Sequence, residues 1–366
     1  MNAIEMLVEM VETISYSRAE GVLAQLVVER MRQLGMQSRV DEAGNAVGYI
    51  GAHPEEAQRT IVLLGHIDTV PGRIPVRIED GKLYGRGSVD AKGPFATFVQ
   101  AVARLEAAAD TSIVVVGAVE EEVASSKGAH FAATQYRPDA CVIGEPSGWD
   151  AVTIGYKGCQ WLDVHGARDC GHGAGPSRAV AEEVVSFWNR IAAEAPSFGP
   201  GGDGIFERVD VRLDAFRTNS DGLRDTARAT VGMRLPEGFR SADFAARARS
   251  LASELGLDVE FRGELPAHTG ARGDGLGRAF GRALASRGVR PRFLKKTGTS
   301  DMNVVGPAWR CPIVAYGPGD SSLDHTPHEH IVLADYERAI DVLADALVAG
   351  AWARPRVPQA SLSASS

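Results

Sequence analysis

Histidine and carboxylate residues stand directly after short apolar segments, or beside glycine-rich loops, at five separate places in the chain. In an open α/β sheet, ligands bind just beyond the carboxyl ends of the strands. Side chains in these places are therefore available for chemistry at one shared edge. They belong to His66, Asp68, Asp90, Glu120, Glu121, Glu122, Glu145, Asp324 and His325.

Taken singly, each of these residues has an ordinary structural explanation, such as a hydrogen-bonded His–Asp pair, a solvated loop or a helix cap. Together they are harder to explain, because clustered carboxylates repel one another unless a cation lies among them. Two histidines with three carboxylates suit zinc, cobalt or manganese. Two such ions, about 3.5–4 Å apart, would share a bridging carboxylate.

Hydrolysis of an amide is the chemistry that such a site favours. A bound metal ion lowers the pKa of water toward about 7, so that a nearby carboxylate can take its proton and later deliver it to the departing amine. Catalysis by a serine nucleophile is disfavoured, because the sequence contains no Gly-x-Ser-x-Gly motif. The four cysteines lack the Cys-x-x-Cys spacing of zinc or redox sites, and we expect them to be reduced, small apolar residues.

The elements that must position these residues have an α/β pattern. Apolar segments without alternation, at 61–64, 113–116 and 141–143, are separated by helical patterns at 94–108 and 127–135. Such strands indicate a sheet that is buried on both faces. The same pattern resumes from about residue 271, with helices expected at 276–287 and 334–349.

A different pattern interrupts this arrangement. Residues 159–167 and 208–216 alternate between apolar and polar side chains, as in antiparallel strands with one wet face, and helical patterns at 177–193 and 241–255 accompany them. We therefore predict a catalytic metal-binding α/β domain over 1–158 and 269–353, with a smaller α+β domain inserted over 159–268. The tail 354–366 has no periodicity and is predicted to be disordered.

Composition excludes several classes of function. The chain has 366 residues, which predicts about two domains. Its 39 basic and 47 acidic residues give a net charge of −8, so nucleic-acid binding is not expected. No apolar stretch is long enough to span a membrane. Glu5, Glu9 and Glu12 interrupt the apolar stretch that a signal peptide needs, and we expect a cytoplasmic protein.

Several motifs, taken in order, resemble those of the M20 family of dinuclear metallopeptidases and deacylases. They are Gly-His-Ile-Asp-Thr-Val at 65–70, Gly-Arg-Gly-Ser-Val-Asp-Ala-Lys-Gly at 85–93, the glutamate run at 120–122, Gly-Glu-Pro-Ser at 144–147 and the late His325. The resemblance covers nearly the whole chain. It implies a zinc-peptidase-like catalytic domain, an inserted dimerisation domain and two divalent metal ions, zinc first and cobalt second.

The resemblance also implies roles for individual residues. His66 and Glu145 would bind one metal ion, Glu122 and His325 the other, and Asp90 would bridge the two. Asp68 would orient His66.

The glutamate run leaves the general base ambiguous, because the family usually shows Asp-Glu-Glu and this chain has Glu-Glu-Glu. Alignment of Glu120 with the leading aspartate makes Glu121 the base and Glu122 the ligand. The alternative shifts both roles back by one residue, to Glu120 and Glu121.

Within the predicted insertion, Gly-His-Gly-Ala-Gly-Pro at 171–176 resembles the family's Gly-His-x-Ala-x-Pro. By this resemblance His172 would reach the active site of the partner subunit in a homodimer and polarise the scissile carbonyl. Arg234 resembles the family arginine that binds a substrate carboxylate, and Asn219 matches a family asparagine near the same site. A turn histidine and a surface-strand arginine are the ordinary alternatives.

Finer motifs, at 144–149, 153–158, 296–303 and 316–327, resemble the LysW-lysine/LysW-ornithine hydrolase branch of the family. That branch removes a finished amino acid from the C-terminal glutamate of a small acidic carrier protein, LysW, in lysine or arginine biosynthesis. The loop Gly298, Thr299, Ser300 and Asp301 would then help to bind the product. The net negative charge opposes an acidic partner, but basic residues such as Lys157, Arg178, Lys295 and Lys296 could form a local patch.

Two alternatives remain. One is a small-molecule deacylase, acting on N-acetylornithine or N-acetyllysine or as a succinyl-diaminopimelate desuccinylase, for which no carrier is needed. The other is a metal-dependent binding protein without catalysis, although no expected ligand or base is missing from the sequence.

Overall fold

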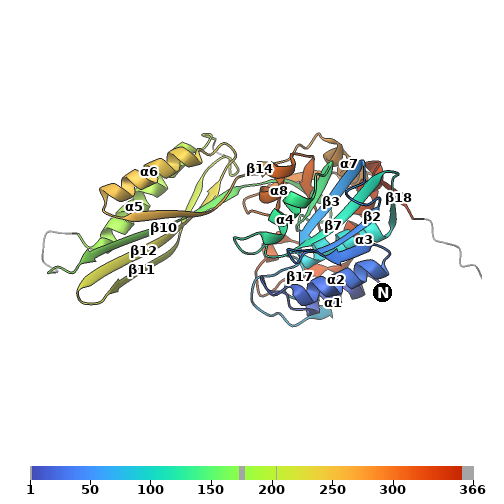
Figure 1. Cartoon of the computed structure of the whole chain (residues 1–366), viewed down its shortest axis with the longest axis horizontal. Helices are drawn as coiled ribbons and strands as arrows, with labels where there is room; N and C mark the ends of the chain where they lie inside the picture. Colours follow the sequence, from blue (N-terminus) through green and yellow to red (C-terminus); the bar gives the residue numbers. More distant parts are fainter. Residues whose placement is uncertain (1, 173–177, 203, 357–366) are drawn as a thin grey trace, which may run out of the picture. The chain divides into compact units, whose positions relative to one another are not determined.

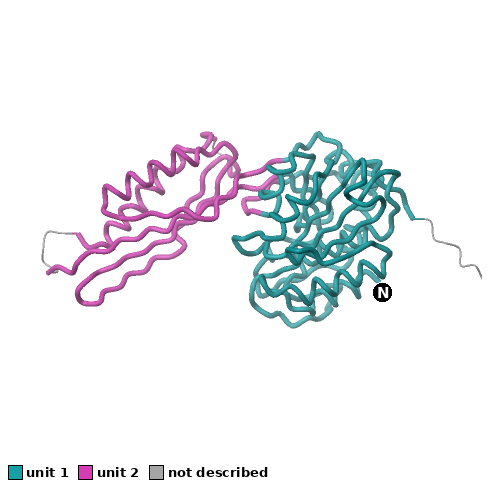
Figure 2. The backbone as a smooth tube through the Cα atoms, viewed as in Figure 1, with its two compact units in different colours: residues 1–154, 270–294, 300–366 teal, residues 155–269, 295–299 magenta. Residues whose placement is uncertain are grey.

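The computed structural model describes residues 2–172, 178–202 and 204–356, and its chain divides into two units. The larger unit comprises residues 1–154, 270–294 and 300–366, and the smaller unit residues 155–269 and 295–299 (Figures 1 and 2). Each unit has its own hydrophobic core. No helix of the described residues is long and apolar enough to cross a membrane.

The larger unit is built on a mixed sheet whose centre is parallel. Strands β7 (Thr111–Ala118), β3 (Arg59–His66), β8 (Ala140–Gly144) and β16 (Ile313–Ala315) lie side by side in this order. Antiparallel strands flank them: β2 (Ala46–Gly51) and β1 (Gln37–Val40) beyond β7, and β9 (Ala151–Tyr156) beyond β16, with β15 (Arg292–Lys296) also paired to β9.

Helices cover this sheet, and the central strands are buried almost from end to end. This confirms the α/β class predicted from unalternated apolar segments. The helices of the larger unit are α1 (Ala3–Glu12), α2 (Gly21–Gln33), α3 (Lys92–Ala103), α4 (Lys127–Gln135), α7 (Gly275–Ala285), α8 (Met302–Trp309) and α9 (Leu333–Ala349), with the short 3-10 helix η2 (Ser321–Leu323).

Two small sheets complete the larger unit. Strands β17 (His330–Val332), β5 (Lys82–Tyr84) and β4 (Arg77–Glu79) form one antiparallel sheet. Strands β18 (Ala353–Pro355) and β6 (Leu105–Ala107) form the other. The helix predicted over 94–108 therefore ends at Ala103, because the residues after Arg104 pair with the C-terminal strand.

The smaller unit is an antiparallel four-stranded sheet with helices on one face. Its strand order is β11 (Asp210–Ser220), β12 (Arg224–Leu235), β10 (Gly158–Asp169) and β13 (Asp258–Leu265). Helices α5 (Val180–Glu194) and α6 (Ser241–Glu254) pack on it, with the 3-10 helix η1 (Ala195–Phe198). The strand β14 (His268–Thr269) pairs with the end of β9.

The boundaries of the two units differ from the predicted ones in three places. The smaller unit begins at 155 rather than 159, and its first segment ends at 269 rather than 268, because Gly155 and Tyr156 pair with the two residues of β14. It also takes in 295–299, where the amide of Lys157 donates to the carbonyl of Lys296. These segments lie beyond the alternating strands from which the insertion was predicted.

The predicted disordered tail is wrong at its start. Arg354 and Pro355 belong to β18, and the Arg354 side chain forms an ion pair with Glu106, 2.9 Å between Nη2 and Oε2. The amide of Arg356 donates to the carbonyl of Arg104. The remainder of that prediction, 357–366, falls outside the described residues.

Candidate metal centre

Three neighbouring parallel strands end at the same edge of the larger sheet, and each leads into a predicted ligand. His66 is the last residue of β3, Glu120–Glu122 follow β7, and Glu145 follows β8. The register aligns these ends, since Gly65 pairs with Gly117 on one side and with Gly144 on the other. The expectation that one sheet edge collects these side chains is met by the strand order.

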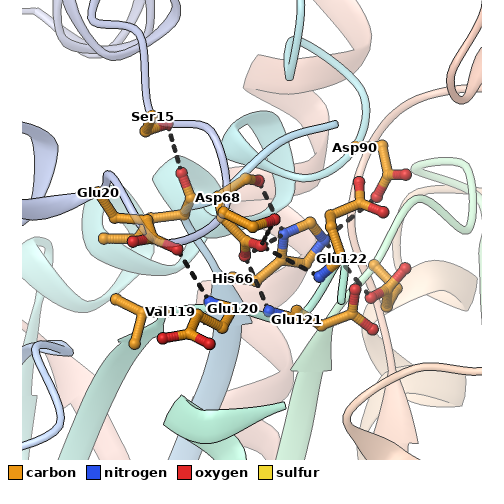
Figure 3. Close-up of polar contacts among 12 residues, drawn as sticks. Ser15, Glu20, His66, Asp68, Asp90, Val119, Glu120, Glu121 and Glu122 are labelled. Carbon is orange, nitrogen blue, oxygen red and sulfur yellow. Dashed lines mark hydrogen bonds and ion pairs between the residues drawn. The ribbon is translucent and has the colours of Figure 1, made fainter. Parts of the chain in front are cut away.

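The carboxylate of Asp90 contacts both predicted histidine ligands, and Figure 3 shows Asp90 together with the first of them, His66. Its Oδ1 is 3.2 Å from Nε2 of His66, and its Oδ2 is 3.1 Å from Nε2 of His325. The carboxylate thus presents one oxygen to each histidine, which is the arrangement that a bridging ligand requires. Asp90 lies one residue before the N-cap of α3, Ala91, and the peptide bond between the two residues is cis.

The remaining two predicted ligands complete the cluster. Nε2 of His325 is 3.0 Å from Oε1 of Glu122, and Nε2 of His66 is 3.9 Å from Oε1 of Glu145. Ligand atoms of His66, Asp90 and Glu122 all lie within 4.8 Å of one another. The cluster therefore has two halves, one around each histidine, with Asp90 between them.

The electrostatics of the cluster fit bound cations. Burial, and then the nearby carboxylates Asp301 and Glu145, raise the pKa of Glu121 well above its usual value. Burial also raises the pKa of Glu122, and it raises that of Asp301 to about 7. Hydrogen bonds that His325 donates to Asp90 and Glu122 raise the pKa of His325 to about 10. Two imidazoles and three carboxylates are a donor set that zinc or cobalt accepts. Bound divalent cations would also offset the repulsion between the clustered carboxylates.

Asp68 connects the first ligand to the glutamate run. Its Oδ1 lies 3.4 Å from Nδ1 of His66 and accepts the amide of Glu121 at 3.0 Å, while its Oδ2 accepts the amide of Glu122 at 3.1 Å. Ser17 Oγ donates to the same Oδ2 at 2.7 Å. Although burial opposes it, the contact with His66 holds the pKa of Asp68 below its usual value. One buried carboxylate thus fixes both the imidazole and the backbone that carries Glu122.

The three glutamates of the run meet three different environments. Glu120 accepts a hydrogen bond from Ser125 Oγ at 2.6 Å and lies 3.7 Å from Arg18. Glu122 contacts His325. The carboxylate of Glu121 makes no hydrogen bond or ion pair within the described part of the chain, and Figure 3 shows it beside the cluster. The geometry favours the alignment in which Glu122 is the ligand; the role of Glu121 stays a prediction.

The predicted substrate-binding residues fall into both units. In the smaller unit, Nη1 of Arg234 donates to Oγ1 of Thr299 at 3.4 Å, and Gly298 precedes Thr299. In the larger unit, Ser300 and Asp301 are buried at the start of α8, and Oδ1 of Asp301 has no hydrogen-bond partner among the described residues.

The other predicted residues of the smaller unit are exposed. His172 follows the end of β10, and the rest of its motif, 173–176, lies outside the described residues. Asn219 lies on β11 opposite Thr226. Lys157, proposed above for a basic surface patch, is instead buried, and its Nζ is 2.6 Å from Oδ2 of Asp210, so it does not belong to such a patch.

Two buried charged residues near Asp90, Lys92 and Glu329, were given no role by the sequence analysis. Nζ of Lys92 donates to the carbonyls of Met10 and Thr13, at the end of α1, and burial lowers the pKa of Lys92 to about 7. Glu329 is completely buried next to the backbone of Asp90. Only its place four residues after a predicted ligand could have drawn attention to it.

Comparisons with known proteins agree with this geometry. Residues 62–349 match the model of peptidase family M20/M25/M40. A LysW-lysine hydrolase of Deinococcus radiodurans is 45% identical over 349 residues, which cover 94% of this chain and 95% of that protein.

Solved structures show the same fold at low sequence identity. An M20 family metallo-carboxypeptidase from Sulfolobus solfataricus has a TM-score of 0.76 at 17% identity, over 96% of this chain and all of that chain (100%). A dinuclear metal-binding peptidase of the M20 family from Bacillus subtilis has a TM-score of 0.65 at 13% identity, over 94% and 96% of the two chains.

Proposed function

Because the chain belongs to peptidase family M20/M25/M40, we propose that it is a metal-dependent amide hydrolase that releases lysine from the C-terminal glutamate of the carrier protein LysW. The near-full-length similarity to a LysW-lysine hydrolase is the observation that carries the choice of substrate. The position of Asp90 between His66 and His325 supports the reaction class.

The residues of the cluster fit two divalent metal ions, and we propose zinc as the resident metal, with cobalt as an active substitute. His66 and Glu145 would hold one ion, Glu122 and His325 the other, and Asp90 both. When bound, the ions supply the Lewis acidity that activates water and polarises the scissile carbonyl.

The chain's own residues divide the remaining work. Asp68 keeps His66 oriented and holds the amides of Glu121 and Glu122 in place. Glu121, whose side chain forms no hydrogen bond or ion pair with the described residues, takes the proton of the attacking water and delivers it to the departing amine nitrogen. The two proton transfers balance, since the base ends the cycle ionised as it began.

Product binding is assigned to the smaller unit and to the loop 298–301. The guanidinium of Arg234 suits the α-carboxylate of the released amino acid, because two parallel N–H groups match a carboxylate. Gly298, Thr299, Ser300 and Asp301 supply amides, hydroxyls and a carboxylate along one loop, and Asn219 supplies an amide. We further propose a homodimer, in which His172 polarises the scissile carbonyl in the partner's site, and a cytoplasmic location.

A direct comparison of substrates tests the proposal. The zinc-loaded enzyme is incubated in parallel with LysW-γ-lysine, LysW-γ-ornithine and N-acetylornithine, and released amino acid is quantified. We expect release from LysW-γ-lysine, with ornithine as a second product to be measured, and little reaction of N-acetylornithine. Preferential hydrolysis of the free acylated amino acid would instead identify a small-molecule deacylase. Glu121→Gln is the matched control for contaminating activity.

A further inference from the structure

Glu329 is a carboxylate that neither the predicted ligand set nor the proposed reaction uses. It lies four residues beyond His325, yet its exposed fraction is 0%, whereas 51% of the His325 side chain is exposed. A completely buried carboxylate is costly unless hydrogen bonds or a paired charge compensate it. The groups that bind the Glu329 carboxylate therefore indicate its role in the structure.

Those partners lie on the loop that carries Asp90. Oε1 of Glu329 accepts the amides of Val89 at 3.0 Å and Asp90 at 3.2 Å. The side chain also receives a backbone hydrogen bond from Gly87. Its own carbonyl accepts the amide of Gly85 at 3.3 Å. Glu329 thus binds four backbone amides between Gly85 and Asp90, including the amide of the bridging residue itself.

Arg86 extends this network to a third segment. Its Nη1 donates to Oε2 of Glu329 at 2.7 Å, and its Nε donates to the carbonyl of Gly72 at 3.1 Å, in the chain that follows His66 and Asp68. The sheet formed by β17, β5 and β4 joins the same two segments, since His330 of β17, next to Glu329, pairs with Tyr84 of β5, next to Gly85. Segments carrying His66, Asp90 and His325 are therefore linked through one ion pair.

We propose that Glu329 is a positioning residue, which sets the backbone of Asp90 relative to His325 so that one carboxylate can serve both halves of the metal centre. The inference rests on the proposed metal centre and goes beyond its ligand set. Residues that orient metal ligands typically change metal affinity about 10–100-fold when they are replaced.

The replacement Glu329→Gln isolates this role. Its amide has one oxygen for two groups of donors, so its NH2 must face either the amides of Val89 and Asp90 or the guanidinium of Arg86. A merely structural residue would lower the stability of the protein without changing metal affinity. The metal affinity of folded protein therefore distinguishes the two roles.

Glu9→Gln is the matched control. Glu9 also pairs with an arginine, because Nε and Nη2 of Arg30 donate to its two carboxylate oxygens, but this pair joins α1 to α2 and contacts no predicted ligand. It makes the same chemical change at another arginine–glutamate pair, whose carboxylate is partly exposed. We expect it to lower the melting temperature and to leave metal binding unchanged.

The experiment is a titration of the chelator-stripped full-length proteins with Zn²⁺ against a chromophoric competitor, with melting temperatures recorded on the metal-free forms. We expect wild type and Glu9→Gln to bind two equivalents with equal affinity, and Glu329→Gln to bind at least one equivalent about 10–100-fold more weakly. The visible absorption of Co²⁺-loaded Glu329→Gln should also change. In turnover, kcat should fall while KM changes less than threefold.

Equal Zn²⁺ affinities of Glu329→Gln and wild type would overturn the inference, even if Glu329→Gln melts earlier. Failure of the wild type itself to bind two equivalents would contradict the proposed metal centre instead. Should Glu329→Gln not fold, Glu329→Asp undergoes the same titration. It keeps the charge but is one methylene shorter, so wild-type affinity there would equally overturn the proposal.

Discussion

The three consecutive glutamates show that neighbouring positions in the chain can give identical side chains different chemical roles. Glu120, Glu121 and Glu122 have the same side chain, yet one pairs with Arg18 and Ser125, one has a raised pKa beside the cluster, and one contacts His325. Glu120 has a φ of 60°, in the left-handed region that non-glycine residues rarely adopt. The backbone turns sharply there, which is why the three side chains diverge.

Glu121→Gln should abolish turnover while both metal ions stay bound, because the base is not a ligand. We expect a loss of about 10²–10⁴-fold in kcat, measured with LysW-γ-lysine alongside metal analysis of the same sample. Glu120→Gln should retain activity, since its side chain serves Arg18 and Ser125. Loss of metal from Glu121→Gln, with an inactive and metal-replete Glu120→Gln, would place the register one residue earlier.

Removal of metal should abolish activity, and Zn²⁺ or Co²⁺ should restore it. Because His66 and His325 contact opposite oxygens of Asp90, His66→Ala and His325→Ala should each lose at least one equivalent. Inductively coupled plasma analysis of dialysed protein measures this directly. Full activity in excess chelator, in protein shown to be metal-free, would contradict the mechanism.

Residue types and their places after apolar segments predicted the part of the cluster that holds His66, Glu122 and Glu145, because a parallel sheet gathers the ends of its strands. Asp90 and His325 were predicted from their glycine-rich loops and from the family resemblance. The supporting residues could not be predicted in the same way. Glu329 binds backbone amides, and backbone amides leave no trace in the identity of the residues that carry them. Likewise, the hydrogen bonds that Asp68 accepts from the amides of Glu121 and Glu122 could be recognised only from the structure.

At the scale of elements, three glycines in register let a helix approach the sheet beneath the metal centre. Gly117, Gly65 and Gly144 stand side by side on β7, β3 and β8, one or a few residues before the predicted ligands. Phe95 and Phe98 of α3 occupy the space that their side chains would fill. Since Asp90 lies only two residues before the first residue of α3, this close packing helps to determine where the bridging carboxylate lies.

Gly117→Ala should therefore destabilise the larger unit. A Cβ atom there would lie 2.8 Å from Cγ2 of Ile67 and 2.9 Å from Cζ of Phe95, both too close. Overpacking of this kind costs about 1–3 kcal/mol, which thermal or urea unfolding can measure. Gly281→Ala, in the middle of α7 with nothing within 4 Å of the new Cβ, is the control. It should be neutral or stabilising, by up to about 1 kcal/mol.

Helices and strands were predictable from the sequence where one hydrophobic periodicity dominated the segment. They were less predictable where pairing with a distant strand determined the local structure. The buried strands and the alternating strands were both predicted correctly in type, because apolar runs and apolar–polar alternation have different causes. The residues 105–107 continue a helical pattern in the sequence, yet they form β6, since β18 offers them a partner. That partner lies at the other end of the chain and has no local signal.

At the scale of the molecule, the chain divides its proposed tasks between two units. The predicted metal ligands all belong to the larger unit, whereas His172, Asn219, Arg234 and Thr299 belong to the smaller one. The smaller unit has an independent core and its own antiparallel sheet. Activity would therefore require residues from both units, and by the proposal above from both subunits.

Mixing two inactive variants tests the proposed homodimer. In a hybrid of His172→Ala and Glu121→Gln, the subunit with intact Glu121 receives the intact His172 of the other chain, so one of the two sites is complete. Activity should reappear after subunit exchange, toward half of the wild-type value per hybrid dimer. No recovery, with exchange verified by native mass spectrometry, would mean that His172 acts within its own chain or has no role in turnover.

The position of the insertion in the chain also has a consequence for assembly of the protein. β16 is hydrogen-bonded to β8, but the entire smaller unit is synthesised between them. Gly155 and Thr269 are paired across that segment, so its folding brings its two ends together and leaves residues 270–312 as the effective connection from β9 to β16. The entropy lost on closing a loop depends on this effective length. Cavities cut into the core around Phe187 or Phe244 should therefore slow completion of the larger sheet, to which neither side chain belongs.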